Sequence, residues 1–121
     1  MAHLLFLGYE FKASDPQWSI INAASMDDIY NYLTQDSLIF IHKDKLEDLE
    51  IYRRLLLIKL ANPYTQIFCV GGLAKYDSKH FIKIDALDIE MTIQDYSKRV
   101  YKLNDSRKYL RDLSEEILKE R

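Results

Sequence analysis

Residues 38–70 read LIFIHKDKLEDLEIYRRLLLIKLANPYTQIFCV, with two short apolar runs on either side of a long amphipathic segment. The runs at 38–42 and 65–70 are rich in Ile, Phe and Val, which favour strands. Between them, apolar residues recur at helical spacing until Asn62 and Pro63 end the pattern: Leu46, Leu49, Tyr52, Leu56 and Leu60. A helix between two strands predicts a right-handed crossover and a parallel strand pair, so this unit predicts an α/β fold.

The start and the sides of this helix are also predictable. Asp44 and Glu47 have the spacing of a capping box, which places the first turn near Asp44. Residues 55–58 are apolar on every side of the helix. We therefore expect cover on more than one side, provided by the domain itself or by a partner.

The remaining segments extend the same alternation. Residues 3–11 (HLLFLGYEF) predict a buried interior strand, and 18–22 and 81–84 predict two further strands. Ser25 has the position of an N-cap for a helix over 26–35, and Thr92 that of a cap for a helical region to the C-terminus, with a break at 104–106. The sequence thus predicts a small three-layer sandwich: a mainly parallel sheet of about five strands with three or four helices.

Length and composition indicate one domain. The 121 residues are 48% apolar and 30% charged, which is typical of a globular chain, and we expect residues 1–121 to form a single α/β domain. The helical segment 92–121 is expected to pack on the sheet or on a partner. A single cysteine, Cys69, excludes an internal disulfide and favours a reducing compartment, so we expect a cytoplasmic protein. No apolar run approaches the ~20 residues of a membrane helix.

Residues 19–72 resemble the middle of a response-regulator receiver domain, which has a flavodoxin-like fold. The resemblance follows the order of a short strand, a helix, LIFIH, a helix containing LEIYRRL, and QIFCV. In that family an aspartate after the third strand accepts phosphate, and acidic residues after the first strand hold magnesium. Here His42 stands in the aspartate's place, followed by Lys43 and Asp44, and the first strand offers only Glu10. The resemblance therefore implies a degenerate, receiver-like regulatory domain without the phospho-acceptor.

A candidate ligand site follows from the predicted parallel sheet, because ligands of such sheets bind beyond the carboxyl ends of the strands. Five residues would share this edge: Glu10, His42, Asp44, Gly71 and Gly72. His42 and Glu10 could form an acid/base pair, and the glycines could let a small molecule or phosphate approach the backbone. In the alternative interpretation Asp44 caps a helix, the glycines form a turn, and His42 is a loop residue.

Other chemistry has little support. Cys69 would be a nucleophile only if His42 activated it, and its place in a strand favours a buried, inert thiol. The three histidines lack metal-ligand spacing, and Gly71 and Gly72 lack the Lys-Ser/Thr ending of a phosphate loop. No motif identifies an enzyme, so we predict no catalytic residue, no metal and no cofactor.

The helices carry an excess of interaction-prone residues. The chain has nine tyrosines, a type that is frequent at binding surfaces. The candidate interaction surface comprises two helix tyrosines and a heptad-spaced C-terminal series: Tyr30, Tyr52, Tyr96, Leu103, Leu110 and Ile117. We therefore favour a non-catalytic protein-interaction or regulatory module that binds another protein or forms a homodimer.

Two alternatives remain. The first is a small-molecule or phosphate-binding protein that uses the carboxyl edge of the sheet. The second, weaker one is nucleic-acid binding through Lys98, Arg99 and Lys102, although the net charge of −2 and the neighbouring acidic residues disfavour it.

Overall fold

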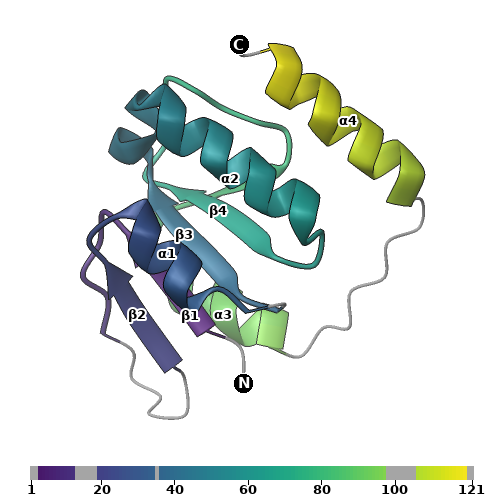
Figure 1. The fold of residues 1–121 in the computed structure, drawn as a ribbon. Helices are drawn as coiled ribbons and strands as arrows, with labels where there is room; N and C mark the ends of the chain where they lie inside the picture. The colour runs from purple at the N-terminus through teal and green to yellow at the C-terminus, as the bar shows by residue number, and fades with distance from the viewer. Residues whose placement is uncertain (1–2, 13–18, 35, 98–105, 120–121) are drawn as a thin grey trace.

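The computed structural model describes residues 3–12, 19–34, 36–97 and 106–119. Five parallel strands form one sheet in the order β2-β1-β3-β4-β5 (Figure 1). The strands are β1 His3–Leu7, β2 Ser19–Ala23, β3 Leu38–His42, β4 Gln66–Val70 and β5 Phe81–Ile84. The helices are α1 Met26–Tyr32, α2 Leu49–Ala61, α3 Ile89–Ser97 and α4 Ser106–Lys119, with short 3-10 turns at Lys43–Glu47 (η1) and Ala86–Asp88 (η2). The predicted α/β fold with a mainly parallel sheet is confirmed.

Helices cover both sides of the sheet, so the domain has three layers. Successive side chains of a strand point to opposite faces, which separates the core into two clusters. On the side of α1, α2 and α4 the sheet presents Leu5, Leu7, Ile39, Ile41, Ile67 and Cys69, which we call the aliphatic face. On the other side it presents Phe6, Phe40 and Phe68, the aromatic face, covered by Ile89 and Ile93 of α3.

Strand register places the three phenylalanines of the aromatic face in one row. Phe6 is the register partner of Phe40, and Phe40 is the register partner of Phe68. Their rings are stacked with centroids 4.8 Å apart in both pairs. Phe11 stacks on Phe6 at 4.6 Å and Tyr96 of α3 meets Phe68 edge-on at 5.1 Å, which extends the row at both ends.

The long helix begins later than its capping box predicts. Residues 43–47 form the 3-10 turn η1, which directs Leu46 into the core. Asp48 is the true N-cap of α2, and its carboxylate accepts a hydrogen bond from the Glu50 N–H at 2.9 Å. The predicted capping box of Asp44 and Glu47 is wrong, because burying Leu46 requires a tighter turn before the helix starts.

The start of α1 agrees with its prediction and that of α3 does not, while α1 ends at Tyr32, earlier than the predicted residue 35. Ser25 has the N-cap position of α1, but its side chain makes no capping hydrogen bond, and the Asp28 carboxylate instead accepts the Ala24 N–H at 2.8 Å. Helix α3 begins at Ile89, so the cap predicted at Thr92 is wrong. Thr92 lies inside the helix and its hydroxyl donates to the Asp88 carbonyl, a bond that a helical threonine can make without ending the helix.

Helix α4 lies beside α2 on the aliphatic side of the sheet (Figure 1). Leu113 is fully buried in the aliphatic cluster and Ile117 packs against it. Glu116 accepts a hydrogen bond from the buried Ser78 hydroxyl at 2.8 Å, which links α4 to the loop between β4 and β5. The C-terminal region thus supplies one helix to each side of the sheet, α3 and α4.

Candidate functional site

All five strands end at the same edge of the sheet because they are parallel. The last residue of β3 and the segments that follow β1, β3 and β4 supply the residues singled out in the sequence: Glu10, His42, Asp44, Gly71 and Gly72. Strand β1 lies between β2 and β3. The chain adds β2 on one side of β1 and then adds β3 on the other side, so the direction of strand addition reverses at β1. In open α/β sheets this switch point is the usual place for a ligand.

His42 is at the centre of this edge. Its Nδ1 accepts the Asp44 backbone N–H at 3.2 Å and lies 3.4 Å from the Asp44 carboxylate. The Tyr9 ring meets the imidazole edge-on, with centroids 5.0 Å apart. A Cβ on Gly71 would lie only 3.3 Å from His42 Nε2, so this glycine leaves room for the ring. The structure therefore brings His42, Asp44 and Gly71 together.

Glu10 and Gly72 stand apart from this group. Glu10 is exposed and makes no hydrogen bond or ion pair with His42 among the described contacts, so the acid/base pair considered as one interpretation is not formed in this structure. The nearest side-chain atom to a Cβ on Gly72 would be Cδ of Lys43, at 3.8 Å. The two glycines both have positive φ, 101° and 123°, which is the conformation of a turn that glycine accommodates most easily.

Burial raises the pKa of two other side chains near this edge, Tyr9 and Cys69. Burial, followed by the charges of Asp44 and Cys69, raises the pKa of the Tyr9 phenol. Burial is also the main cause that raises the pKa of the Cys69 thiol, with a further contribution from Asp77. The thiol is buried and lies 3.7 Å from the Gly72 carbonyl. A buried thiol with a raised pKa is a poor nucleophile, as expected for an inert cysteine.

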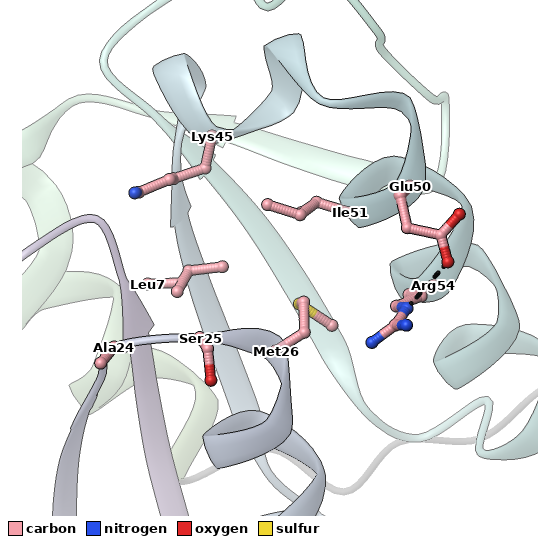
Figure 2. A pocket seen from close by; sticks show the side chains of 8 residues that line it. All are labelled: Leu7, Ala24, Ser25, Met26, Lys45, Glu50, Ile51 and Arg54. Carbon is pink, nitrogen blue, oxygen red and sulfur yellow. Dashed lines mark hydrogen bonds and ion pairs between the residues drawn. The ribbon is translucent and has the colours of Figure 1, made fainter.

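A pocket of about 330 Å³ opens at the same edge on the aliphatic side of the sheet, between α1 and α2 (Figure 2). Four segments line it, from the end of β1, the junction of β2 and α1, the turn η1 and the first turns of α2: Leu7, Ala24, Ser25, Met26, Lys45, Glu50, Ile51 and Arg54. None of these residues was predicted as a ligand contact. No motif joins them in the sequence, because they meet only when α1 and α2 pack on the sheet.

Arg54 lies at the rim of the pocket and connects α2 to α1. Its Nε donates to the Glu50 carboxylate at 3.0 Å, and its Nη1 lies 4.0 Å from the Asp27 carboxylate. The hydrogen bond to Glu50 is the main cause that raises the pKa of Arg54. The pKa of Tyr30 on α1 is raised by partial burial, and the charge of Arg54 opposes that rise. These four side chains form one polar cluster between the two helices.

The predicted interaction residues differ in how exposed they are. Tyr30 is 43% exposed, whereas Tyr52 is 1% exposed, stacks on Tyr76, and donates its hydroxyl to the Asp77 carbonyl. Tyr96 and Ile117 are partly buried in the two core clusters. Tyr52 is therefore a core residue and not part of a binding surface. Leu103 and the side chain of Leu110 lie outside the described residues, as do Lys98, Arg99 and Lys102.

The described residues contain neither a metal centre nor a membrane-spanning helix. In the described part of the chain, no group of three or more His, Cys, Asp or Glu side chains is arranged to hold a metal ion. None of the described helices has the length and apolar composition needed to cross a bilayer. No family model matches the chain, and no curated protein or solved structure matches it.

Proposed function

We propose that this chain is a non-catalytic, cytoplasmic protein-interaction or regulatory module that binds its partner through the outer side of α1 and α2. The surface consists of Tyr30, Arg54 and Leu57, and we call it the α1–α2 surface. The first partner to test is a second copy of the chain. The resemblance of residues 19–72 to receiver domains supports a regulatory role, and the strand order is the flavodoxin-like one that this resemblance implies.

The observation that carries the proposal is the exposure of Leu57. Its neighbours Leu55, Leu56 and Ile58 are buried, so the domain itself covers almost the whole apolar run. Leu57 alone in that run is 48% exposed, on the side of α2 that points away from the sheet. A large apolar side chain on a helix surface has no function in the core, and its burial against a partner would stabilise an interface.

Arg54 joins Leu57 to Tyr30. Arg54 is three residues before Leu57 on α2, so their side chains are neighbours on one helix face. On its other side Arg54 pairs with Asp27 of α1, which is three residues before Tyr30. Tyr and Arg are the residue types that most often dominate the energy of protein interfaces. The carboxylates of Glu50 and Asp27 hold the Arg54 side chain in place, which lowers the entropy lost on binding.

Site-specific photo-cross-linking tests which surface meets a partner. A benzoyl-phenylalanine residue replaces Leu57 in the full chain, produced in its native host. The control places the same group at Leu87, which is 96% exposed in η2, just before α3 on the opposite side of the sheet. We expect a discrete cross-linked product from position 57 and none from position 87. Mass spectrometry of the product then distinguishes a second copy from another protein.

Sedimentation velocity over a range of concentrations tests self-association directly. We expect reversible association that weakens at least about ten-fold in Leu57→Asp, because the change places a charge in an apolar interface. The matched variant Leu87→Asp is expected to behave as the unmodified chain. Cross-linking at position 87 but not at 57, or at neither position, would contradict the proposed surface.

A further inference from the structure

The pocket between α1 and α2 has the size and the position of a ligand site. Its volume of about 330 Å³ lies at the lower end of the range of about 300–1,000 Å³ that small-molecule sites occupy. It opens beyond the carboxyl ends of β1, β2 and β3, at the switch point of the sheet. This location is the one that ligands of open α/β sheets use most often.

Apolar side chains form the interior of the pocket. Leu7 and Met26 are buried beneath it, and Ile51 of α2 is partly buried at its side. Figure 2 shows Ile51 and the stem of Lys45 on one side of the opening, with Leu7, Ser25 and Met26 on the other. An apolar interior of this kind favours a ligand with a hydrocarbon or ring body.

A positively charged side chain lies at each end of the pocket, and only one of the two forms an ion pair within the described part of the chain. At one end Arg54 is neutralised by Glu50, to which it is hydrogen-bonded at 3.0 Å. At the other end Lys45 has no carboxylate within ion-pair distance among the described residues. Ser25 also lines the pocket, and its hydroxyl makes no capping bond to α1. The arrangement therefore leaves the positive charge of Lys45 for an anionic group.

Gly8 determines where the stem of Lys45 lies. It directly follows β1 and has a φ of 88°, a conformation that side-chain-bearing residues rarely adopt. A Cβ at this position would come within 2.8 Å of the His42 Cβ and 3.1 Å of the Lys45 Cγ. The absence of a side chain at Gly8 thus leaves room both for His42 and for the stem of Lys45, which crosses the end of β1 and lines the pocket.

We infer that this pocket binds a small amphiphilic anion, with its apolar body over Leu7, Met26 and Ile51 and its carboxylate or phosphate on Lys45. The inference is independent of the proposed interaction surface, because Lys45 and the pocket interior are not part of that surface. Arg54 is the one residue that the two share.

Amide chemical shifts of the ¹⁵N-labelled full chain test the inference with three probes that have the same chain length. Hexanoate carries a carboxylate, hexyl phosphate carries a phosphate, and hexanol carries no charge. We expect saturable shifts at the amides around Ser25, Lys45 and Ile51 with at least one of the anions, and at least about ten-fold weaker binding of hexanol. The tighter of the two anions identifies the head group.

Two lysine variants separate a specific contact from general charge attraction. Lys45→Gln should weaken binding of the anion about ten-fold and leave hexanol unchanged, whereas Lys45→Arg should retain most of the affinity. Lys75→Gln is the control, because Lys75 is also exposed but lies over the Tyr76 ring in the loop after β4. The amide spectrum of each variant reports whether it is folded.

Three results would overturn the inference. The first is the absence of saturable shifts with both anions. The second is hexanol binding as tightly as the anions. The third is equal affinity of Lys45→Gln and Lys75→Gln for the anion. Each of these results leaves the α1–α2 surface untouched, because that proposal is tested at Leu57.

Discussion

The two faces of the sheet are built from the same five strands but are covered in different ways. Three helices, α1, α2 and α4, cover the aliphatic face with Leu, Ile and Met side chains. On the aromatic face, α3 is the one helix of the described residues that covers the sheet, together with Tyr9 and Phe11, which follow β1. Both faces are nevertheless buried at the centre, where Ile39 and Phe40 are fully inaccessible.

The comparison shows that large side chains on one face of a sheet can provide part of the packing that helices provide on the other face. Each phenylalanine of the aromatic face fills more volume than the Ile or Leu on the opposite side, and the three rings stack in register. Stacked rings gain energy beyond their buried area. These stacked rings therefore help to close the aromatic face, on which α3 is the packed helix of the described part of the chain.

The largest expected effect is the loss of the central ring. Phe40→Ala should lower the free energy of unfolding by about 4 kcal/mol, because it removes a buried ring and leaves a cavity. Ile39→Ala, at the adjacent position on the aliphatic face, should cost about 3 kcal/mol. Urea denaturation followed by circular dichroism measures both values.

A double-mutant cycle sharpens this comparison. Phe40 and Phe68 should show a coupling energy of about 1 kcal/mol, since truncating either ring removes the stack. Ile39 and Ile67 have the same register relation on the aliphatic face and provide the matched pair. Equal coupling in the two pairs would mean that stacking adds nothing to the burial of the rings.

Local patterns in the sequence were sufficient to predict the sheet. The apolar runs around Leu5, Phe40 and Phe68 identify the three interior strands, and the helix between β3 and β4 requires those strands to be parallel. Helix starts were predicted less well, because a cap depends on tertiary packing. Asp44 and Asp48 both precede acidic residues, and only the burial of Leu46 selects Asp48 as the cap.

The site was predicted only in part, for a physical reason. The carboxyl edge follows from strand direction alone, so His42, Asp44 and Gly71 were expected to meet. The pocket depends on how two helices pack on the sheet, and single-residue patterns do not contain that information. The position of Tyr52 was mispredicted for a related reason. Its helical spacing fits a core position as well as a surface position, so the sequence alone does not distinguish the two.

Helix α2, on the aliphatic face, has a buried charge in its last turn, and this charge makes the stability of the domain depend on pH. Lys59 of α2 is buried and donates hydrogen bonds to the carbonyls of Thr65 at 2.6 Å and Pro63 at 3.3 Å. Burial lowers its pKa from 10.5 to about 8. Between these two pH values the unfolded chain binds the proton more tightly, so this group makes the folded state more stable as the pH rises from about 8 to about 10.5.

Comparison with Lys59→Met isolates this contribution. The stability of the unmodified chain relative to the variant should increase by about 2 kcal/mol between about pH 7 and pH 9.5, while the effects of the tyrosines and other lysines cancel. Urea denaturation at each pH measures the difference. Parallel pH profiles of the two proteins would mean that Lys59 keeps an ordinary pKa in the folded state.

The smallest expected effect on stability concerns α4, which packs beside α2 on the aliphatic face. Glu116 accepts the Ser78 hydroxyl at 2.8 Å and lies 3.5 Å from His80 Nε2, so it fixes α4 to the loop after β4. Glu116→Gln keeps the shape but removes the charge, and should cost about 1 kcal/mol because hydrogen bonds to a charged group are the stronger kind. Glu115→Gln changes the exposed neighbour on the same helix and should change the free energy of unfolding by no more than about 0.5 kcal/mol.

Amide hydrogen exchange across α4 should accelerate only in the Glu116 variant, because loss of the hydrogen bond to Ser78 makes local opening of the helix easier. Equal exchange in the two variants would mean that Leu113 and Ile117 alone hold α4 on the aliphatic face.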